Sequence, residues 1–127
     1  MTSDTIGVRK PLRIYCIEDN PLIVFHIEHL IEKAGHVLAG FADSFSQLTA
    51  DPAAIDIDGA LVDVDLADGR TGPDAAAWLK ERGIPSIFVT GQQDIANLYA
   101  DRVVGVVIKP IVAQDFADKV QRLDGRT

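Results

Sequence analysis

The stretch Gly59-Ala-Leu-Val-Asp63-Val-Asp-Leu-Ala-Asp-Gly69 decides how the rest of the chain is interpreted. An apolar run at residues 60–62 leads into a carboxylate at Asp63, a second acid follows at Asp65, and Asp68-Gly69 is a turn signal. A short apolar run bounded by turn residues is typical of a buried strand in a parallel sheet. Because ligand sites of open α/β sheets lie beyond the carboxyl ends of the strands, Asp63 stands where a reactive group is expected.

Strand and helix patterns alternate along the whole chain. Asn20-Pro21 supplies an N-cap and a first-turn proline for the first helix, and Gly35 supplies its stop. The alternation predicts an α/β fold, a doubly wound five-stranded parallel sheet of the (βα)5 type with helices on both faces. The expected strands are residues 12–17, 37–41, 58–63, 85–90 and 103–108, and the expected helices are residues 21–34, 44–50, 72–82, 94–100 and 112–123.

Length, charge and composition limit the classes of function that the chain can have. With 127 residues we expect one domain at residues 11–124, preceded by a flexible tail at residues 1–10 and with no output domain. A formal net charge of −7 argues against direct binding of nucleic acid or of an anionic membrane. No targeting segment is present and no apolar run approaches the roughly 20 residues of a membrane span, so we expect a cytoplasmic protein. The single cysteine, Cys16, lies in an apolar run and is interpreted as a core thiol.

Polar residues follow four of the five expected strands. Glu18-Asp19 follows the first strand, Asp63 the third, Thr90 the fourth and Lys109 the fifth. The carboxyl ends of parallel strands share one edge of a sheet, so these groups are expected to meet in one cleft.

Several carboxylates in one cleft require compensation. Two such charges about 4 Å apart repel by roughly 4 kcal/mol at an effective dielectric constant near 20. Oxygen ligands suit a hard cation, and a site with few protein ligands is typical of Mg²⁺. The ammonium of Lys109 and the hydroxyl of Thr90 suit a phosphoryl group. Together with Asp63 as a nucleophile, these groups predict phosphoryl transfer onto an aspartate.

The chain resembles a bacterial two-component response-regulator receiver domain, whose fold is flavodoxin-like (CheY-like). The resemblance covers residues 12–123 and rests on Glu18-Asp19, on Asp63 with the loop that follows it, on Thr90-Gly91 and on Lys109-Pro110, in this order and each at a strand end. It implies that Asp63 accepts a phosphoryl group from a sensor histidine kinase or a histidine phosphotransfer protein.

The resemblance also implies roles for the neighbours of Asp63. Asp19 and Asp63 would bind Mg²⁺ directly, Glu18 through water, and Asp65 through its backbone carbonyl. Thr90 and Lys109 would contact the phosphoryl group and couple it to a conformational change.

The chain departs from the family pattern at several positions. Val106 stands three residues before the lysine, where many members carry an aromatic switch residue, and Ala67 replaces a common proline. Asp65 adds an acid two residues after the phosphoacceptor, and we hypothesise that it alters the lifetime of the phosphoryl group. Phe88-Val-Thr-Gly-Gln92 is similar, at three of five positions, to the Phe-Ala-Thr-Gly-Tyr segment of single-domain "FAT GUY" regulators linked to alphaproteobacterial stress signalling.

The sequence leaves three functions open. The first is a stand-alone receiver that signals by protein–protein contact or drains phosphoryl groups as a phosphate sink, with only self-directed phosphorylation and dephosphorylation as enzymatic activity. The second is a haloacid-dehalogenase-like phosphatase, because Asp63-Val-Asp65 mimics its nucleophile and acid. The third is a receiver-like interaction module that is never phosphorylated. A downstream protein partner, and a homodimer, would use the fourth helix, fifth strand and fifth helix, the usual output face of the family.

Two histidines on the first helix offer another kind of site. His26 and His29 are three residues apart, so both lie on one side of the helix. A metal site or a phosphohistidine is conceivable there, but a solvated helix face is the simpler interpretation.

Overall fold

The computed structural model describes residues 10–125. The expectation of a flexible tail at residues 1–10 falls almost entirely on residues 1–9, which lie outside the described residues. Within the described part of the chain, no helix combines the length and the apolar character that a bilayer span requires.

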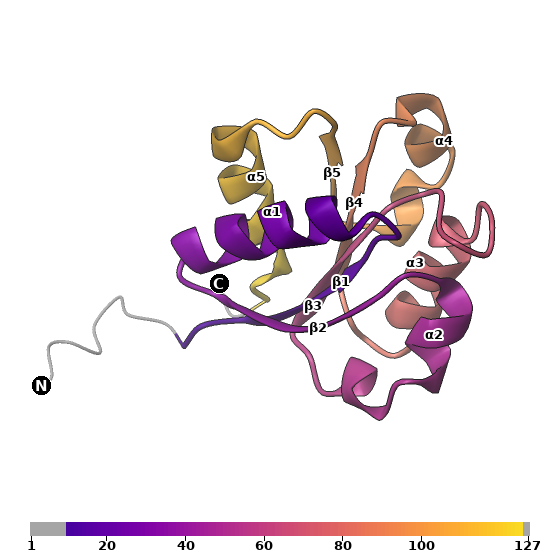
Figure 1. Cartoon of the computed structure of the whole chain (residues 1–127), viewed down its shortest axis with the longest axis horizontal. Helices are drawn as coiled ribbons and strands as arrows, with labels where there is room; N and C mark the ends of the chain where they lie inside the picture. The colour runs from indigo at the N-terminus through magenta and orange to yellow at the C-terminus, as the bar shows by residue number, and fades with distance from the viewer. Residues whose placement is uncertain (1–9, 126–127) are drawn as a thin grey trace, which may run out of the picture.

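Five parallel strands form one sheet at the centre of the structure (Figure 1). The order β2-β1-β3-β4-β5 reverses direction at β1, as in a doubly wound sheet, so the predicted fold class is confirmed. β1 pairs with both β2 and β3, and β4 pairs with β3 and β5. The strands are β1 (Arg13–Ile17), β2 (Val37–Ala42), β3 (Gly59–Val62), β4 (Ser86–Thr90) and β5 (Gly105–Ile108).

Helices cover both faces of the sheet and create two cores. α1 and α5 pack on one face, and α2, α3 and α4 pack on the other (Figure 1). Successive residues of β1 face opposite cores: Ile14 and Cys16 join the first, and Tyr15 and Ile17 join the second. The helices are α1 (Pro21–Lys33), α2 (Phe45–Ala50), α3 (Gly72–Glu81), α4 (Gln93–Leu98) and α5 (Ala113–Val120).

The first helix begins and ends where the sequence predicts. The side chain of Asn20 accepts a hydrogen bond of 3.0 Å from the backbone N–H of Leu22, and Pro21 is the first helical residue. Gly35, with φ of 89°, turns the chain out of the helix. Glu18-Asp19 therefore lies in the short segment between the carboxyl end of β1 and the capped start of α1.

The differences from the expected elements are confined to their ends and to one loop. Residues 51–57, expected as a loop, contain a 3₁₀ helix at Pro52–Ile55 whose first turn is capped by Asp51. The fourth helix ends at Leu98 rather than at residue 100, and a 3₁₀ helix at Ala100–Arg102 follows. The fifth strand therefore begins at Gly105 instead of Val103. These boundaries depend on tertiary anchors such as the Arg102 guanidinium, which donates to the carbonyl of Pro73.

Gly72 allows α3 to start against the backbone of the loop that carries Asp63. Its N–H donates to the carbonyl of Val64 at 2.9 Å. A Cβ atom at residue 72 would overlap the carbonyl oxygen of Asp63 and would lie 2.6 Å from the Cα of Val64. Only a residue without a side chain permits this approach, so Gly72 fixes the position of Asp63 relative to α3.

We expect Gly72→Ala to lower the free energy of unfolding by about 1–3 kcal/mol, because the added methyl group must displace backbone. Urea unfolding followed by circular dichroism measures the loss. Gly91→Ala is the matched control, because a Cβ at residue 91 meets no atom within 4 Å. Equal stability of the two variants would contradict the proposed role of Gly72.

Candidate functional site

Three carboxylates meet at the carboxyl edge of the sheet. Glu18 and Asp19 follow β1, and Asp63 follows β3, its neighbour in the sheet. The backbone N–H of Asp63 continues the pairing of the two strands by donating to Ile17 at 3.0 Å. One carboxylate oxygen from each of the three acids lies within 4.8 Å of the others. The structure thus brings together the acids that the sequence placed at strand ends.

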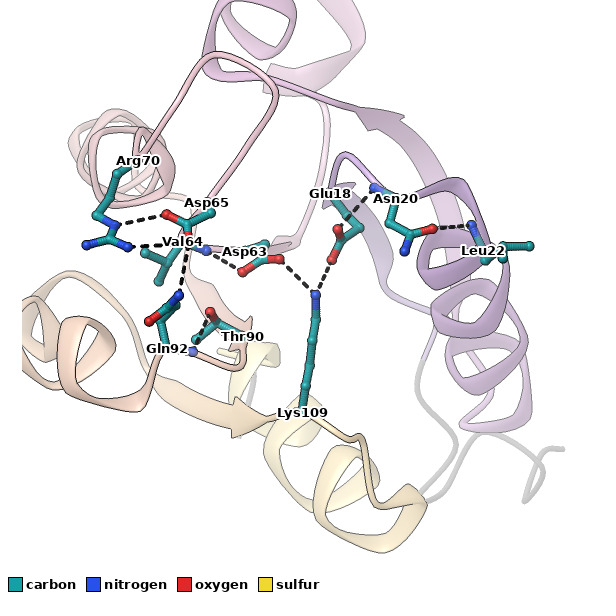
Figure 2. Close-up of polar contacts among 10 residues, drawn as sticks. All are labelled: Glu18, Asn20, Leu22, Asp63, Val64, Asp65, Arg70, Thr90, Gln92 and Lys109. Atoms are coloured by element: carbon teal, nitrogen blue, oxygen red, sulfur yellow. Dashed lines mark hydrogen bonds and ion pairs between the residues drawn. The ribbon is translucent and has the colours of Figure 1, made fainter.

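Lys109 binds two of these acids at once (Figure 2). Its Nζ donates to Glu18 Oε1 at 2.7 Å and to Asp63 Oδ2 at 2.8 Å. The side chain of Lys109 is 22% exposed, that of Asp63 11% and that of Glu18 3%. The ion pairs are therefore largely shielded from water. Charge–charge attraction in such a shielded position is stronger than at an open surface.

Backbone donors orient the two buried acids further. The N–H of Asn20 donates to Glu18 Oε2 at 3.1 Å, and the N–H of Val64 donates to Asp63 Oδ1 at 2.7 Å. Each oxygen of Asp63 thus has one donor and keeps a lone pair free. The carboxylate of Asp63 is fixed in direction without being fully saturated.

Burial and the ion pairs made by Lys109 act in opposite directions on the pKa values of Glu18 and Lys109. Burial raises the pKa of Glu18, and the negative charge of Asp63 adds to this, while Lys109 opposes both. Burial alone would lower the pKa of Lys109, but its hydrogen bonds to Asp63 and Glu18 outweigh that effect and raise it. Lys109 is therefore held as an ammonium cation.

The donor set suits a magnesium ion. Three carboxylates face one ammonium group, so the cluster retains an excess of negative charge. All of the available ligand atoms are oxygens, and Asp19 is exposed, which leaves room for the water molecules that Mg²⁺ usually keeps. Glu18, Asp19 and Asp63 together fit the ion that the sequence predicts. The proposed contribution of the Asp65 backbone carbonyl stays a prediction.

Thr90 completes the edge of the sheet between Asp63 and Lys109. It is fully buried at the end of β4, and its carbonyl accepts the N–H of Lys109 at 2.9 Å. Its hydroxyl oxygen accepts the N–H of Gln92 at 3.1 Å, which leaves the hydroxyl hydrogen available for another acceptor.

The side chain of Asp65 lies outside the acidic cluster (Figure 2). Arg70 Nε donates to Asp65 Oδ1 at 2.9 Å, and Gln92 Nε2 donates to Asp65 Oδ2 at 3.2 Å. The hydrogen bond from Arg70 holds the pKa of Asp65 below its ordinary value, and Gln92 acts in the same direction. Asp65 thus joins the loop after β3 to the loop after β4. The sequence does not predict this link, because Arg70 and Gln92 carry no motif that identifies them.

Asp68 has a structural role that the sequence shows only as a turn signal. Its two carboxylate oxygens accept the backbone N–H groups of Phe45 and Ser46, at 3.2 and 3.1 Å. It also accepts the hydroxyl of Thr71, which lowers its pKa. Because Phe45 and Ser46 are the first residues of α2, Asp68 attaches the loop after Asp63 to that helix.

The remaining sequence candidates lie outside the cluster. His26 and His29 are exposed on α1, as expected for a solvated face. Val106, at the position of the family's aromatic switch, is half-buried and packs against the core between the sheet and α2, α3 and α4. Cys16 is fully buried, and burial raises the pKa of its thiol, which confirms a core position.

Comparison with known proteins agrees with this arrangement. A curated relative, the phyllosphere-induced regulator PhyR of Methylorubrum extorquens, is 38% identical over 79 residues, which are 61% of this chain and 30% of that protein. The solution structure of the PhyR receiver domain of Erythrobacter litoralis has 29% identity, a TM-score of 0.79 and 89% coverage of both chains. The crystal structure of the anti-anti-sigma factor PhyR of Bartonella quintana has 26% identity and a TM-score of 0.78, covering 95% of this chain and 50% of that one.

The chain spans less than a third of the curated relative and half of the Bartonella protein. The similarity therefore concerns one domain of those longer proteins. A family model described as the response regulator receiver domain matches residues 14–121, from the start of β1 to the end of α5. This protein belongs to the receiver-domain family of the response regulators of two-component and phosphorelay signalling.

Proposed function

We propose that Asp63 accepts a phosphoryl group and that the chain acts as a phosphorylation-controlled signalling switch. The observation that carries the proposal is the position of Lys109, whose ammonium bonds Asp63 and Glu18 inside a cluster of three acids. This arrangement fixes the direction of the Asp63 carboxylate and places a cation beside the position that a phosphoryl oxygen would occupy. Membership of the receiver family supports the same role.

Phosphoryl transfer requires one bond to form and one to break. An oxygen of Asp63 forms a bond to phosphorus through a free lone pair, and the bond from phosphorus to the donor group breaks, with its electrons leaving on the donor. From a phosphohistidine the leaving group is the imidazole nitrogen, which is why a histidine kinase or a phosphotransfer protein is the expected donor. Lys109 and the Thr90 hydroxyl would bind oxygens of the transferred group.

Magnesium has a defined place in this proposal. Bound by Glu18, Asp19 and Asp63, the ion would neutralise charge on the transferred phosphoryl group. The chain's own residues do the rest: Lys109 keeps Asp63 oriented, and the backbone N–H of Val64 fixes the rotation of its carboxylate.

The signal would leave the site through Thr90 and Lys109. Lys109 has to share its ammonium with the new phosphoryl oxygens, which weakens its bonds to Glu18 and Asp63. Thr90 contacts the backbone of Gln92, the residue immediately before α4, so a shift of its hydroxyl acts on that helix. Val106 offers no aromatic ring for a rotation, so the change would pass through backbone and loop rather than through a ring flip.

The proposed output face is formed by α4, β5 and α5. Leu98, the last residue of α4, is 72% exposed, and Val112, which immediately precedes α5, is 63% exposed, which suits contact with a protein partner or with a second copy. PhyR of Bartonella quintana is described as an anti-anti-sigma factor, and regulation of a transcription-factor antagonist in the cytoplasm is one form this output could take. A stand-alone regulator or a phosphate sink, including one of the "FAT GUY" type, remains part of the proposal.

The family result favours this function over the two rivals. In the phosphatase hypothesis, acids after the lysine would supply metal ligands. Asp115 is instead bound to Lys119 and Asp118 to Gln114, both within α5, and neither belongs to the acidic cluster of the described residues. An interaction module that is never phosphorylated would have no need for the buried Lys109–Asp63 contact.

The direct test is incubation with acetyl phosphate and Mg²⁺ followed by intact-mass spectrometry. We expect one phosphoryl adduct in the wild-type protein, none in Asp63→Asn, and none when EDTA removes the metal. Glu81→Gln, at the exposed end of α3, is the control and should be modified like the wild type. An adduct that survives in Asp63→Asn, or its absence from the wild type, would contradict the proposal.

Asp65 should shorten the lifetime of the phosphorylated state. Asp65→Asn removes a carboxylate that can orient water near Asp63, and we expect the half-life of the adduct to lengthen by about fivefold, the equivalent of about 1 kcal/mol for an exposed charge contact. Arg70→Gln removes the ion-pair partner of Asp65 and leaves its hydrogen bond from Gln92; it should shorten the half-life, but only while Asp65 is present. Identical decay in the wild type and Asp65→Asn would refute this role.

A further inference from the structure

A groove of about 430 Å³ lies between α1 and β2 and is separate from the proposed output face. β2 is an edge strand of the sheet, and α1 runs alongside it (Figure 1). Its apolar lining consists of the buried Val24 and the exposed Phe25 of α1, and of the half-buried Leu38 and the exposed Phe41 of β2. At one end the groove reaches Glu18 and Asp19 of the acidic cluster. Its volume is in the range of about 300–1,000 Å³ that is typical of binding pockets.

The two phenylalanines that line this groove are largely exposed to solvent. Phe25 is 73% exposed and Phe41 63%, and Leu22, one helical turn before Phe25, is 77% exposed. The buried side of α1 is supplied by other residues, among them Val24, Ile27, Leu30 and Ile31. Phe25 and Phe41 are therefore not needed for the core, and contiguous apolar side chains of this kind mark interaction surfaces.

The charged side chains that line the groove are all acidic, although Glu18 among them is buried and paired with Lys109. Glu28 and Asp43 line it together with Glu18 and Asp19, and no Lys, Arg or His is among its lining residues. A second copy of the chain would bring the same acids into contact, and each copy has a formal net charge of −7. Like charges brought together at an interface oppose association, so the groove is not suited to a symmetric dimer.

We propose that this groove binds an amphipathic helix of another protein, with large apolar side chains between Phe25 and Phe41 and with Lys or Arg residues facing Glu28 and Asp43. The apolar stripe of such a helix would contact the apolar side chains of α1 and β2 that line the groove. Its cationic side would face the acidic side chains at the border of the groove. β2 and β5 are opposite edges of the sheet, so this groove is a second contact surface, separate from the proposed output face of α4, β5 and α5.

The test is an NMR titration of the ¹⁵N-labelled protein with a synthetic helical peptide of Leu and Lys, arranged with one apolar and one cationic face. We expect chemical-shift changes at Val24, Phe25, Leu38 and Phe41, and an affinity that falls as salt is added. A peptide with Glu in place of Lys should bind at least tenfold more weakly, because it meets the acidic border with like charge.

Matched variants separate the groove from general attraction to an acidic protein. Phe25→Ser combined with Phe41→Ser should weaken binding of the Lys peptide by about tenfold or more, and Glu28→Lys by about fivefold. Leu98→Ser, at a side chain that is 72% exposed on α4, and Glu81→Lys, on α3, should leave it unchanged. Asp63→Asn, which is expected not to be phosphorylated, should bind the Lys peptide like the wild type. Failure of phosphorylation and failure of peptide binding can therefore be distinguished.

Three results would overturn the proposal. The first is no binding of the Lys peptide, and the second is equal binding by the groove variants and the wild type, given circular dichroism spectra that show all of them folded. The third is self-association in sedimentation velocity that is lost in the Phe25→Ser, Phe41→Ser variant, which would assign the groove to a second copy of the chain.

Discussion

The double ion pair of Lys109 with Glu18 and Asp63 is the interaction on which the site depends. It joins three strand ends, since Glu18 follows β1, Asp63 follows β3 and Lys109 follows β5. β4 separates β3 from β5, so the lysine reaches Asp63 across the end of the strand that carries Thr90. Without the ammonium, largely buried carboxylates would face one another at a cost of several kcal/mol. The order of the strands therefore determines which charged side chains meet in the site, as well as how the strands pack.

The sequence predicts the fold and the centre of the site because both follow from patterns local to the chain. Strand–helix alternation specifies the layers, and in a parallel sheet the residues that end the strands must share one edge. Glu18, Asp63 and Lys109 could therefore be placed together, and the structure confirms it. The cap of α1 was equally predictable, because Asn20-Pro21 acts on its own neighbours.

Features that depend on side-chain direction or on close approach were not predictable in this way. The sequence identifies Asp65 as an extra acid, but its pairing with Arg70 and Gln92 depends on how two loops lie after folding. Asp68 reads as a turn former, whereas its carboxylate caps a helix more than 20 residues earlier in the chain. Gly72 reads as a helix start, and only the folded structure shows that its missing side chain makes room for the Asp63 backbone.

The central claim is that Lys109 and Thr90 exchange their present contacts for a phosphoryl group on Asp63. A crystal structure with Mg²⁺ and beryllium fluoride, a stable mimic of the phosphoryl group, tests it most directly. The account predicts beryllium bonded to an Asp63 oxygen, its fluorines contacted by Lys109 Nζ and Thr90 Oγ1, and the metal held by Glu18, Asp19 and Asp63. Fluoride bound elsewhere, or an unmodified Asp63 with Lys109 still bonded to it, would contradict the account.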